Sequence, residues 1–301
     1  MECNPLLEAA VLMSDCSIIN SNDNTEGIEE YSFDINKNST RAELLDAIML
    51  YLCQRIELKF SAFRGDYVLT KLLPDITRAT KDTDFLISEE GQYSKLRDVL
   101  YELGDLFISR GIAIDYVVKD TITPTSSSGI QINMGAGIPN LKIDVGWHDL
   151  SWGITKWTYE GFNCDRFEVE RMLADKISAI YSRKRFRRTK DIYDFFILTN
   201  NFKVDMIKLH EYVNRRGLID WDADPFKENV LVEYSKAYDK LDISTVDGSP
   251  ILKPEFSLVI ERLQWFMNNY NFDGFCDVKS GDLYHNGWYN KFGGISQRQG
   301  W

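Results

Sequence analysis

The spacing of apolar residues changes near residue 165, and this change is the strongest constraint on the fold. Before it, short runs with strand alternation, such as Thr83–Ile87 and Leu141–Trp147, stand among runs with helical spacing. From Phe167 onward, most apolar residues recur every three or four positions, as on one face of a helix. The sequence therefore predicts a domain of mixed α and β structure followed by a helical domain.

Three segments follow from this change and from the charge distribution. Residues 1–39 carry eight Asp or Glu and one Lys, so they hold −7 of the net charge of −11 and are expected to form an acidic arm. Residues 40–165 are expected to form the α/β domain, and residues 166–301 the helical domain with an irregular tail. Helices are predicted at Thr40–Lys59, Tyr67–Leu73, Tyr93–Ser109, Lys203–Arg215, Pro225–Leu241 and Pro254–Tyr270, and further strands at Ala113–Lys119 and Ile130–Met134.

The composition limits the classes of function. A net charge of −11 disfavours a protein that binds nucleic acid over its whole surface, and 44% hydrophobic residues suffice for a core. No apolar run approaches the roughly 20 residues of a membrane span, and the first residues lack the basic region of a secretion signal, so a cytoplasmic protein without a membrane partner is expected. Three histidines leave little material for histidine-based metal sites or triads, whereas carboxylates are abundant.

Two aspartates form the first candidate site. Residues two apart in a strand point to the same side, so Asp82 and Asp84 are expected to present adjacent carboxylates. Such a pair suits Mg²⁺, which is usually held by one or two carboxylates together with substrate phosphates. The Gly65-Asp66 turn, which leads into a helix, would let backbone N–H groups approach a phosphate. The alternative is a solvated pair of aspartates at the start of a strand.

A third aspartate follows in a later strand. Alternation in Leu141–Trp147 places Asp144 on the face opposite the apolar residues Ile143 and Val145. If this strand neighbours that of Asp84, three carboxylates converge, which suits metal-assisted phosphoryl or nucleotidyl transfer. The alternative is that Asp144 belongs to the polar face of an amphipathic edge strand.

The second candidate site begins on the helix that follows Phe167. Lys176 lies on a mostly apolar helix, with Arg183 on the same face seven residues later, and the two could grip a triphosphate. Residues 183–190 contain six basic residues, which could dock phosphates or an RNA backbone. Asp191 and Asp194, three apart on the next helix, are close enough to orient these groups. The alternative is a solvated basic loop with Asp191 as a helix cap.

These motifs occur in the order of a known family. Gly65, the run Arg78-Ala-Thr80-Lys81-Asp82-Thr83-Asp84, Lys142-Ile143-Asp144, Ala174-Asp175-Lys176-Ile-Ser-Ala179, Arg183 and Lys190-Asp191-Ile192-Tyr193-Asp194 resemble the motifs of the AbiEii-type nucleotidyltransferase toxins, a branch of the polymerase β-like nucleotidyltransferases. The resemblance covers roughly residues 60–200. It implies an α+β fold, with a mixed-sheet nucleotidyltransferase domain followed by a helical bundle.

The resemblance also implies an activity and its residues. It implies dependence on Mg²⁺ or Mn²⁺, an NTP donor, an RNA acceptor such as tRNA or a protein acceptor, and a cognate antitoxin in a toxin–antitoxin or abortive-infection system. Asp82, Asp84 and Asp144 would bind metal, and Lys176 and Asp191 would complete the catalytic site. Nucleotide contacts would come from Gly65, Asp66, Arg78, Thr80, Lys176 and Arg183.

One position departs from the family pattern. The family usually has a second small residue after the first glycine, whereas this chain has Asp66. A carboxylate beside a triphosphate is unfavourable unless it faces metal or solvent. Two other functions therefore stay open, namely a catalytically silent nucleotide- or protein-binding module on the same fold and a phosphotransferase that moves the γ-phosphate.

Overall fold

The computed structural model describes residues 34–55, 61–80, 82–88, 91–112, 131–134, 141–147, 149–182, 188–217, 219–220, 222–245, 248–270, 274–277 and 282–285. The helices are α1 Arg41–Cys53, α2 Gly65–Leu72, α3 Gly91–Ser109, α4 Val169–Ile180, α5 Thr189–Asn201, α6 Met206–Arg216, α7 Glu228–Asp239 and α8 Phe256–Asn268. The strands are β1 Ser61–Arg64, β2 Asp82–Ile87, β3 Gln131–Met134, β4 Leu141–Trp147, β5 Ile154–Tyr159, β6 Phe162–Phe167, β7 Val204–Asp205, β8 Gly274–Asp277 and β9 Asp282–His285. All these elements lie in one compact unit, Ile35–Trp301, distinct from Met1–Asp34.

Six of the strands form the main sheet, in the order β3-β4-β2-β1-β6-β5. Strand β2 is parallel to β4 and antiparallel to β1, and β1 is parallel to β6. The outer pairs β3–β4 and β5–β6 are antiparallel. The sheet is therefore mixed, as expected, and its two central strands, β1 and β2, each have a parallel and an antiparallel neighbour.

Strand β2 owes its position to its alternating side chains. Thr83 and Phe85 are buried, while Asp82 and Asp84, which alternate with them, are only partly buried, and the strand is wholly buried from Phe85 to Ile87. Such a strand suits the centre of a sheet. Its apolar end is covered by the core, and its polar end can reach the surface. The two aspartates thus lie at the end where β2 begins.

Helix α1 begins where the sequence predicts. The Thr40 hydroxyl accepts a hydrogen bond from the Glu43 N–H at 3.3 Å, and the Glu43 carboxylate accepts one from the Thr40 N–H at 2.6 Å. This capping box satisfies two N–H groups that the helix itself leaves without partners. The helix packs on β2, β6 and α3 through a buried face of Leu44, Leu45, Ile48 and Leu52. It ends at Cys53, earlier than Lys59, and β1 starts at Ser61.

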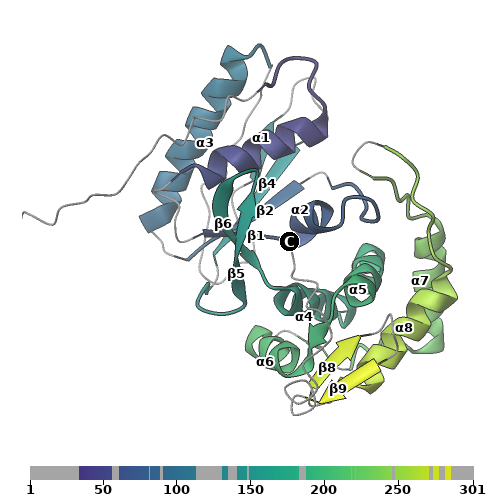
Figure 1. The fold of residues 1–301 in the computed structure, drawn as a ribbon. Coiled ribbons are helices and arrows are strands. Elements are labelled where there is room, and N and C mark those ends of the chain that lie inside the picture. The colour runs from purple at the N-terminus through teal and green to yellow at the C-terminus, as the bar shows by residue number, and fades with distance from the viewer. Residues whose placement is uncertain are drawn as a thin grey trace, which may run out of the picture. The chain divides into compact units, whose positions relative to one another are not determined.

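The chain from Val169 onward is largely helical, as expected. Helix α4 packs against α5 and α6, and α5 packs against α7 and α8. Figure 1 shows these C-terminal elements in green to yellow, with α4 and α5 next to each other. A tyrosine and a phenylalanine on α5, Tyr193 and Phe195, are fully buried in this packing. Whether the boundary lies at residue 165 stays a prediction.

Several strands escape the sequence patterns. Strands β5 and β6 carry polar residues on one face and pair with each other over their whole length, so their stability comes from the pairing and not from an apolar run. The helical half also contains an antiparallel sheet, β7-β8-β9. The predicted irregular tail is wrong at its start, because Tyr284 and His285 belong to β9 and pair with β8.

Other expectations lie outside the described residues. These are the strand at Ala113–Lys119, nearly all of the acidic arm at residues 1–39, and the tail beyond His285. In the described part of the chain, no helix combines the length and the apolar character that crossing a bilayer requires.

The capping box yields a first prediction. Thr40→Ala removes the hydroxyl acceptor and is expected to lower the free energy of unfolding by about 1 kcal/mol, measured by urea denaturation. Thr40→Ser keeps a hydroxyl and is the matched control, expected to stay within about 0.5 kcal/mol of the original protein. Equal losses in both variants would contradict the capping role.

Candidate functional site

The paired strands β2 and β4 bring two of the predicted aspartates together. The register places Asp84 directly opposite Asp144, and Asp82 opposite Lys142, so the two strands are neighbours as the third-carboxylate hypothesis requires. The Thr80 hydroxyl donates a hydrogen bond to the Asp82 carboxylate at 2.6 Å and fixes its orientation. Thr80, expected to contact nucleotide, therefore positions an aspartate in this structure.

The environment of Asp84 is strongly acidic. Burial raises the pKa of Asp84 to about 7, and the carboxylates of Asp66, Asp82 and Asp144 contribute to the rise against the opposing effect of Arg64. Arg64 lies 3.9 Å from the Asp84 carboxylate. Like charges gathered in this way favour a bound cation, and their oxygen atoms are the ligands that Mg²⁺ and Mn²⁺ prefer.

The residues therefore suit a hard divalent cation by their chemistry. In the described part of the chain, however, no three His, Cys, Asp or Glu side chains are already arranged around one point as a metal site. The metal-binding roles of Asp82, Asp84 and Asp144 stay predictions.

Gly65 connects β1 to α2 in contact with Asp84. Its φ angle is +75°, a region that side chains rarely adopt, and a Cβ atom at this position would overlap the Asp84 carboxylate. The absence of a side chain therefore lets the start of α2 pass directly against Asp84. A glycine is required here for two independent reasons, the backbone angle and the space.

This double requirement yields a second prediction. Gly65→Ala is expected to lower the free energy of unfolding by about 1 kcal/mol for the backbone angle and by about 1–3 kcal/mol more for the overlap. Gly111→Ala is the matched control, because Gly111 has the same φ of +75° but no neighbouring atom near the added Cβ. Chemical denaturation of both variants measures the difference, and equal losses would show that the contact with Asp84 is unimportant for stability.

The second candidate site forms a buried ionic cluster around Lys176. Its amino group lies 2.7 Å from the Asp66 carboxylate, 2.7 Å from that of Asp194 and 3.1 Å from that of Asp191. Only 8% of Lys176 is exposed. We call this the lysine cluster, and its members are Asp66, Arg78, Lys176, Lys190, Asp191 and Asp194.

Arg78 and Lys190 complete the lysine cluster. The Arg78 guanidinium donates two hydrogen bonds to Asp194, at 3.0 and 3.2 Å, and a third to Asp66. Lys190 lies 3.3 Å from Asp66. One carboxylate, that of Asp66, therefore has three cationic partners.

The electrostatic result is that Asp66 and Lys176 are held in their charged forms, whereas burial raises the pKa of Asp194. Burial alone would raise the pKa of Asp66, but the charges of Lys176, Arg78 and Lys190 hold that pKa well below its usual range. Burial alone would lower the pKa of Lys176, but Asp194, Asp66 and Asp191 raise it well above its usual value. Each charge is compensated by opposite charges at contact distance, as a buried ion requires.

The lysine cluster confirms one expectation and changes another. Asp191 and Asp194 both contact the Lys176 amino group, as their spacing on the helix predicts, and Asp194 also binds Arg78, for which the helical spacing made no prediction. Lys176 and Arg78, however, form ion pairs with Asp66 in this structure. The Asp66 carboxylate thus contacts the cations that were expected to bind a triphosphate. Arg183 lies outside the described residues.

A double-mutant cycle tests the coupling in the lysine cluster. Asp66→Asn and Lys176→Met are each expected to destabilise the protein by about 3–5 kcal/mol, because each leaves buried charges without a partner, while the double variant loses less than the sum. The control pair is Lys156–Asp165, at 2.8 Å on β5 and β6, whose lysine side chain is 86% exposed. Its coupling is expected at about 0–1 kcal/mol, and a similarly small value for Asp66–Lys176 would contradict the assignment.

The sequence patterns miss a second charged feature. A cavity of about 350 Å³, which we call the arginine pocket, is lined by Arg64, Asp149, Trp152, Phe167, Arg171, Asp175, Arg215 and Arg216. These residues come from β1, β6, α4, α6 and the segment before β5, so no local motif joins them. The available signals are weak ones, the four-residue spacing of Arg171 and Asp175 on α4 and the Arg215-Arg216 pair at the end of α6.

The chain matches a model of a known protein family. Residues 52–233 match the family model described as nucleotidyl transferase AbiEii toxin, Type IV TA system. No curated protein sequence matches the chain.

Solved structures of low sequence identity also align with the chain. A candidate nucleotidyltransferase from H. pylori is 16% identical, with a TM-score of 0.46, over 73% of this chain and 89% of its own. MenT4, a nucleotidyltransferase toxin from Mycobacterium tuberculosis H37Rv, is 15% identical, with a TM-score of 0.41, over 64% of this chain and 71% of its own. An antigenic nucleotidyltransferase-like protein from Paracoccidioides brasiliensis is 13% identical, with a TM-score of 0.39, over 75% of this chain and 99% of its own.

Proposed function

The chain belongs to the AbiEii nucleotidyltransferase toxin family and is a nucleotidyltransferase, and we propose that it moves NMP from an NTP to an acceptor hydroxyl with a divalent metal ion at Asp82, Asp84 and Asp144. The observation that carries this proposal is the parallel pairing of β2 and β4, which sets Asp84 opposite Asp144. Gly65 adds to it, since the start of α2 passes against the same carboxylate.

The chain's own residues would prepare this site in two ways. Asp82 is oriented by Thr80, so that its carboxylate and that of Asp84 emerge from one face of β2. Asp144 supplies the third carboxylate from β4. A bound Mg²⁺ or Mn²⁺ would supply charge neutralisation at the phosphates and a lower pKa for the attacking hydroxyl. In the transfer, the acceptor oxygen would bond to the α-phosphorus while its proton passes to solvent, and the bond from that phosphorus to the leaving pyrophosphate would break.

Lys176 and Asp191 would complete the site from the helical part of the chain. In this proposal residues 40–165 carry the metal-binding carboxylates, and residues 166–301 carry Lys176 and Asp191. The lysine cluster joins the two, because Asp66 and Arg78 meet Lys176 and Asp194. Its role is to hold the start of α2, and with it Gly65, at a fixed position beside Asp84.

The family match supports a proposal for the biological setting. We place the protein as the toxin of a toxin–antitoxin or abortive-infection system in the cytoplasm, with a cognate antitoxin as its partner. The acceptor in this proposal is RNA such as tRNA, with a protein hydroxyl as the other acceptor class.

A second candidate function is a catalytically silent nucleotide-binding module. One observation favours it, namely the Asp66 carboxylate on Lys176, Arg78 and Lys190, where a triphosphate would otherwise find its cations. Such a module would bind nucleotide without Mg²⁺ and would not depend on Asp84. A binding measurement tests it: for such a module, Asp66→Ser is expected to increase the affinity for nucleotide.

Label transfer distinguishes these functions and gives a further prediction. Purified protein is incubated with each α-³²P-labelled NTP, Mg²⁺ and total RNA, and label on RNA or protein is measured. Wild type is expected to transfer label, and Asp84→Asn is expected to reduce transfer on the order of 100-fold or more. EDTA is expected to abolish transfer, since the carboxylates act through the metal ion.

The matched control is Asp98→Asn, which removes the same charge from a carboxylate that is 68% exposed on α3. This variant is expected to keep wild-type transfer. Label that moves only from γ-³²P-labelled NTP would indicate a phosphotransferase instead. Binding of nucleotide without transfer from any donor would favour the silent module.

A further inference from the structure

The arginine pocket carries more positive than negative charge. Four guanidinium groups line it, from Arg64, Arg171, Arg215 and Arg216, against the two carboxylates of Asp149 and Asp175. In the lysine cluster, by contrast, Asp66, Asp191 and Asp194 already oppose the cations at contact distance. Among the described residues, Arg215 also pairs with Glu211 at 2.7 Å, so Arg64 and Arg216 are the pocket arginines whose charge is available beside the candidate aspartates.

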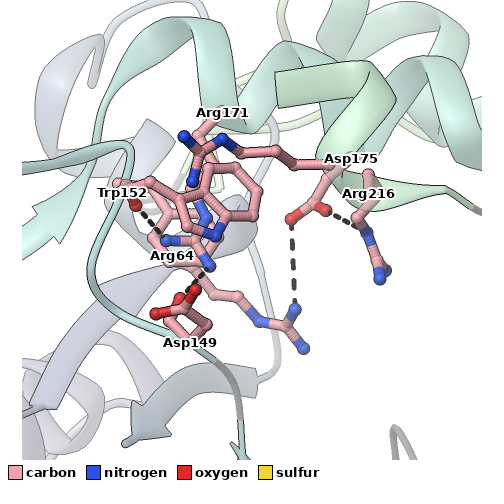
Figure 2. Close-up of a pocket in the computed structure, with 8 residues that line it drawn as sticks. Arg64, Asp149, Trp152, Arg171, Asp175 and Arg216 are labelled. Atoms are coloured by element: carbon pink, nitrogen blue, oxygen red, sulfur yellow. Dashed lines mark hydrogen bonds and ion pairs between the residues drawn. The ribbon is translucent and has the colours of Figure 1, made fainter. Parts of the chain in front are cut away.

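Arg171 forms a rigid wall of the arginine pocket. Its guanidinium lies 3.9 Å from the ring centres of both Trp152 and Phe167, and it donates hydrogen bonds to the backbone carbonyls of Asp149, at 2.9 Å, and Trp152. Figure 2 shows this guanidinium against the Trp152 ring. Burial lowers the pKa of Arg171 to about 10, so it remains charged at pH 7. A buried cation so held does not reorganise when a ligand arrives.

The other arginines keep donors available. Asp175 lies between Arg216, at 2.8 Å, and Arg64, at 3.9 Å, as Figure 2 shows. Both carboxylate partners of Arg64, Asp84 and Asp175, are 3.9 Å away, beyond hydrogen-bond distance. A guanidinium has five N–H donors in a planar fork that matches the oxygens of a phosphate. Arg64 and Arg216 can therefore bind a phosphate while they keep these ion pairs.

Position and size agree with a substrate site. Arg64 lines the arginine pocket and also contacts Asp84, so a ligand in the pocket lies next to the proposed metal-binding carboxylates. A volume of about 350 Å³ is in the lower range for small-molecule sites. The aromatic rings are covered by Arg171, which leaves guanidinium groups as the recognition elements.

We propose that the arginine pocket binds a phosphate group of the transfer substrates, either the triphosphate of the donor or a phosphodiester at the end of an RNA acceptor. This inference rests on the proposed nucleotidyl transfer for its biological meaning, but the binding itself does not require turnover. It assigns phosphate recognition to Arg64 and Arg216, at a place separate from Lys176.

The experiment measures binding without metal, in EDTA, so that no transfer occurs. Tripolyphosphate and ATP are titrated by calorimetry, and a short 5′-labelled single-stranded RNA is titrated by filter binding. Arg64→Gln and Arg216→Gln are each expected to lower the affinity for the phosphate ligand by about 10-fold, because each variant loses one charge-assisted hydrogen-bonding group. Arg216→Lys keeps the charge but not the fork, and it is expected to recover only part of the affinity.

Arg110→Gln is the matched control, because it removes the same charge at an exposed position after α3, outside the pocket. Weaker tripolyphosphate and ATP binding in the pocket variants supports a donor site, and weaker RNA binding alone supports an acceptor site. Unchanged binding of every probe, or losses equal to those of Arg110→Gln, would overturn the proposal. Absence of label transfer in the separate activity assay would instead count against nucleotidyl transfer and leave the binding result standing.

Discussion

The contact between Lys176 and the three aspartates around it is the interaction on which the rest of the site depends. Lys176 comes from α4, Asp66 from α2, and Asp191 and Asp194 from α5, so a single amino group fixes three helices. Buried charges of this kind are costly unless each finds its partners, so the arrangement is all-or-none. Because α2 starts at Gly65, which contacts Asp84, the position of the Asp84 carboxylate is linked to the packing of the helical elements.

The parts of this site that follow local rules could be predicted from the sequence. The alternation of β2 and β4 placed Asp82, Asp84 and Asp144 on polar faces, and the helical spacing of Asp191 and Asp194 placed both beside Lys176. Strands with a polar face, such as β5 and β6, could not be predicted in this way, since they are defined only by their pairing with each other. The arginine pocket could not be predicted either, because Arg64, Arg171 and Arg216 meet only through the tertiary fold.

Asp66 illustrates why a motif alone does not determine chemistry. By sequence it departs from the small residue usual in the family, and nothing local predicts its partners. In the fold it meets Lys176, Arg78 and Lys190, cations contributed by three different segments. The Asp66 carboxylate thus compensates the charge of these cations from within the chain. The residue after the glycine of this turn therefore takes part in contacts with elements far along the chain.

The connectivity of the lysine cluster has a consequence for biosynthesis. Asp66 and Lys176 are 110 residues apart, and Arg78 and Asp194 are 116 residues apart. A ribosome delivers the N-terminal partners well before the C-terminal ones, and long-range contacts of this kind form late in folding. A nascent chain that holds the aspartates of β2 and β4 therefore still lacks the lysine that locks α2 in place. The site is therefore complete only after Asp194 has been translated and the helices have packed.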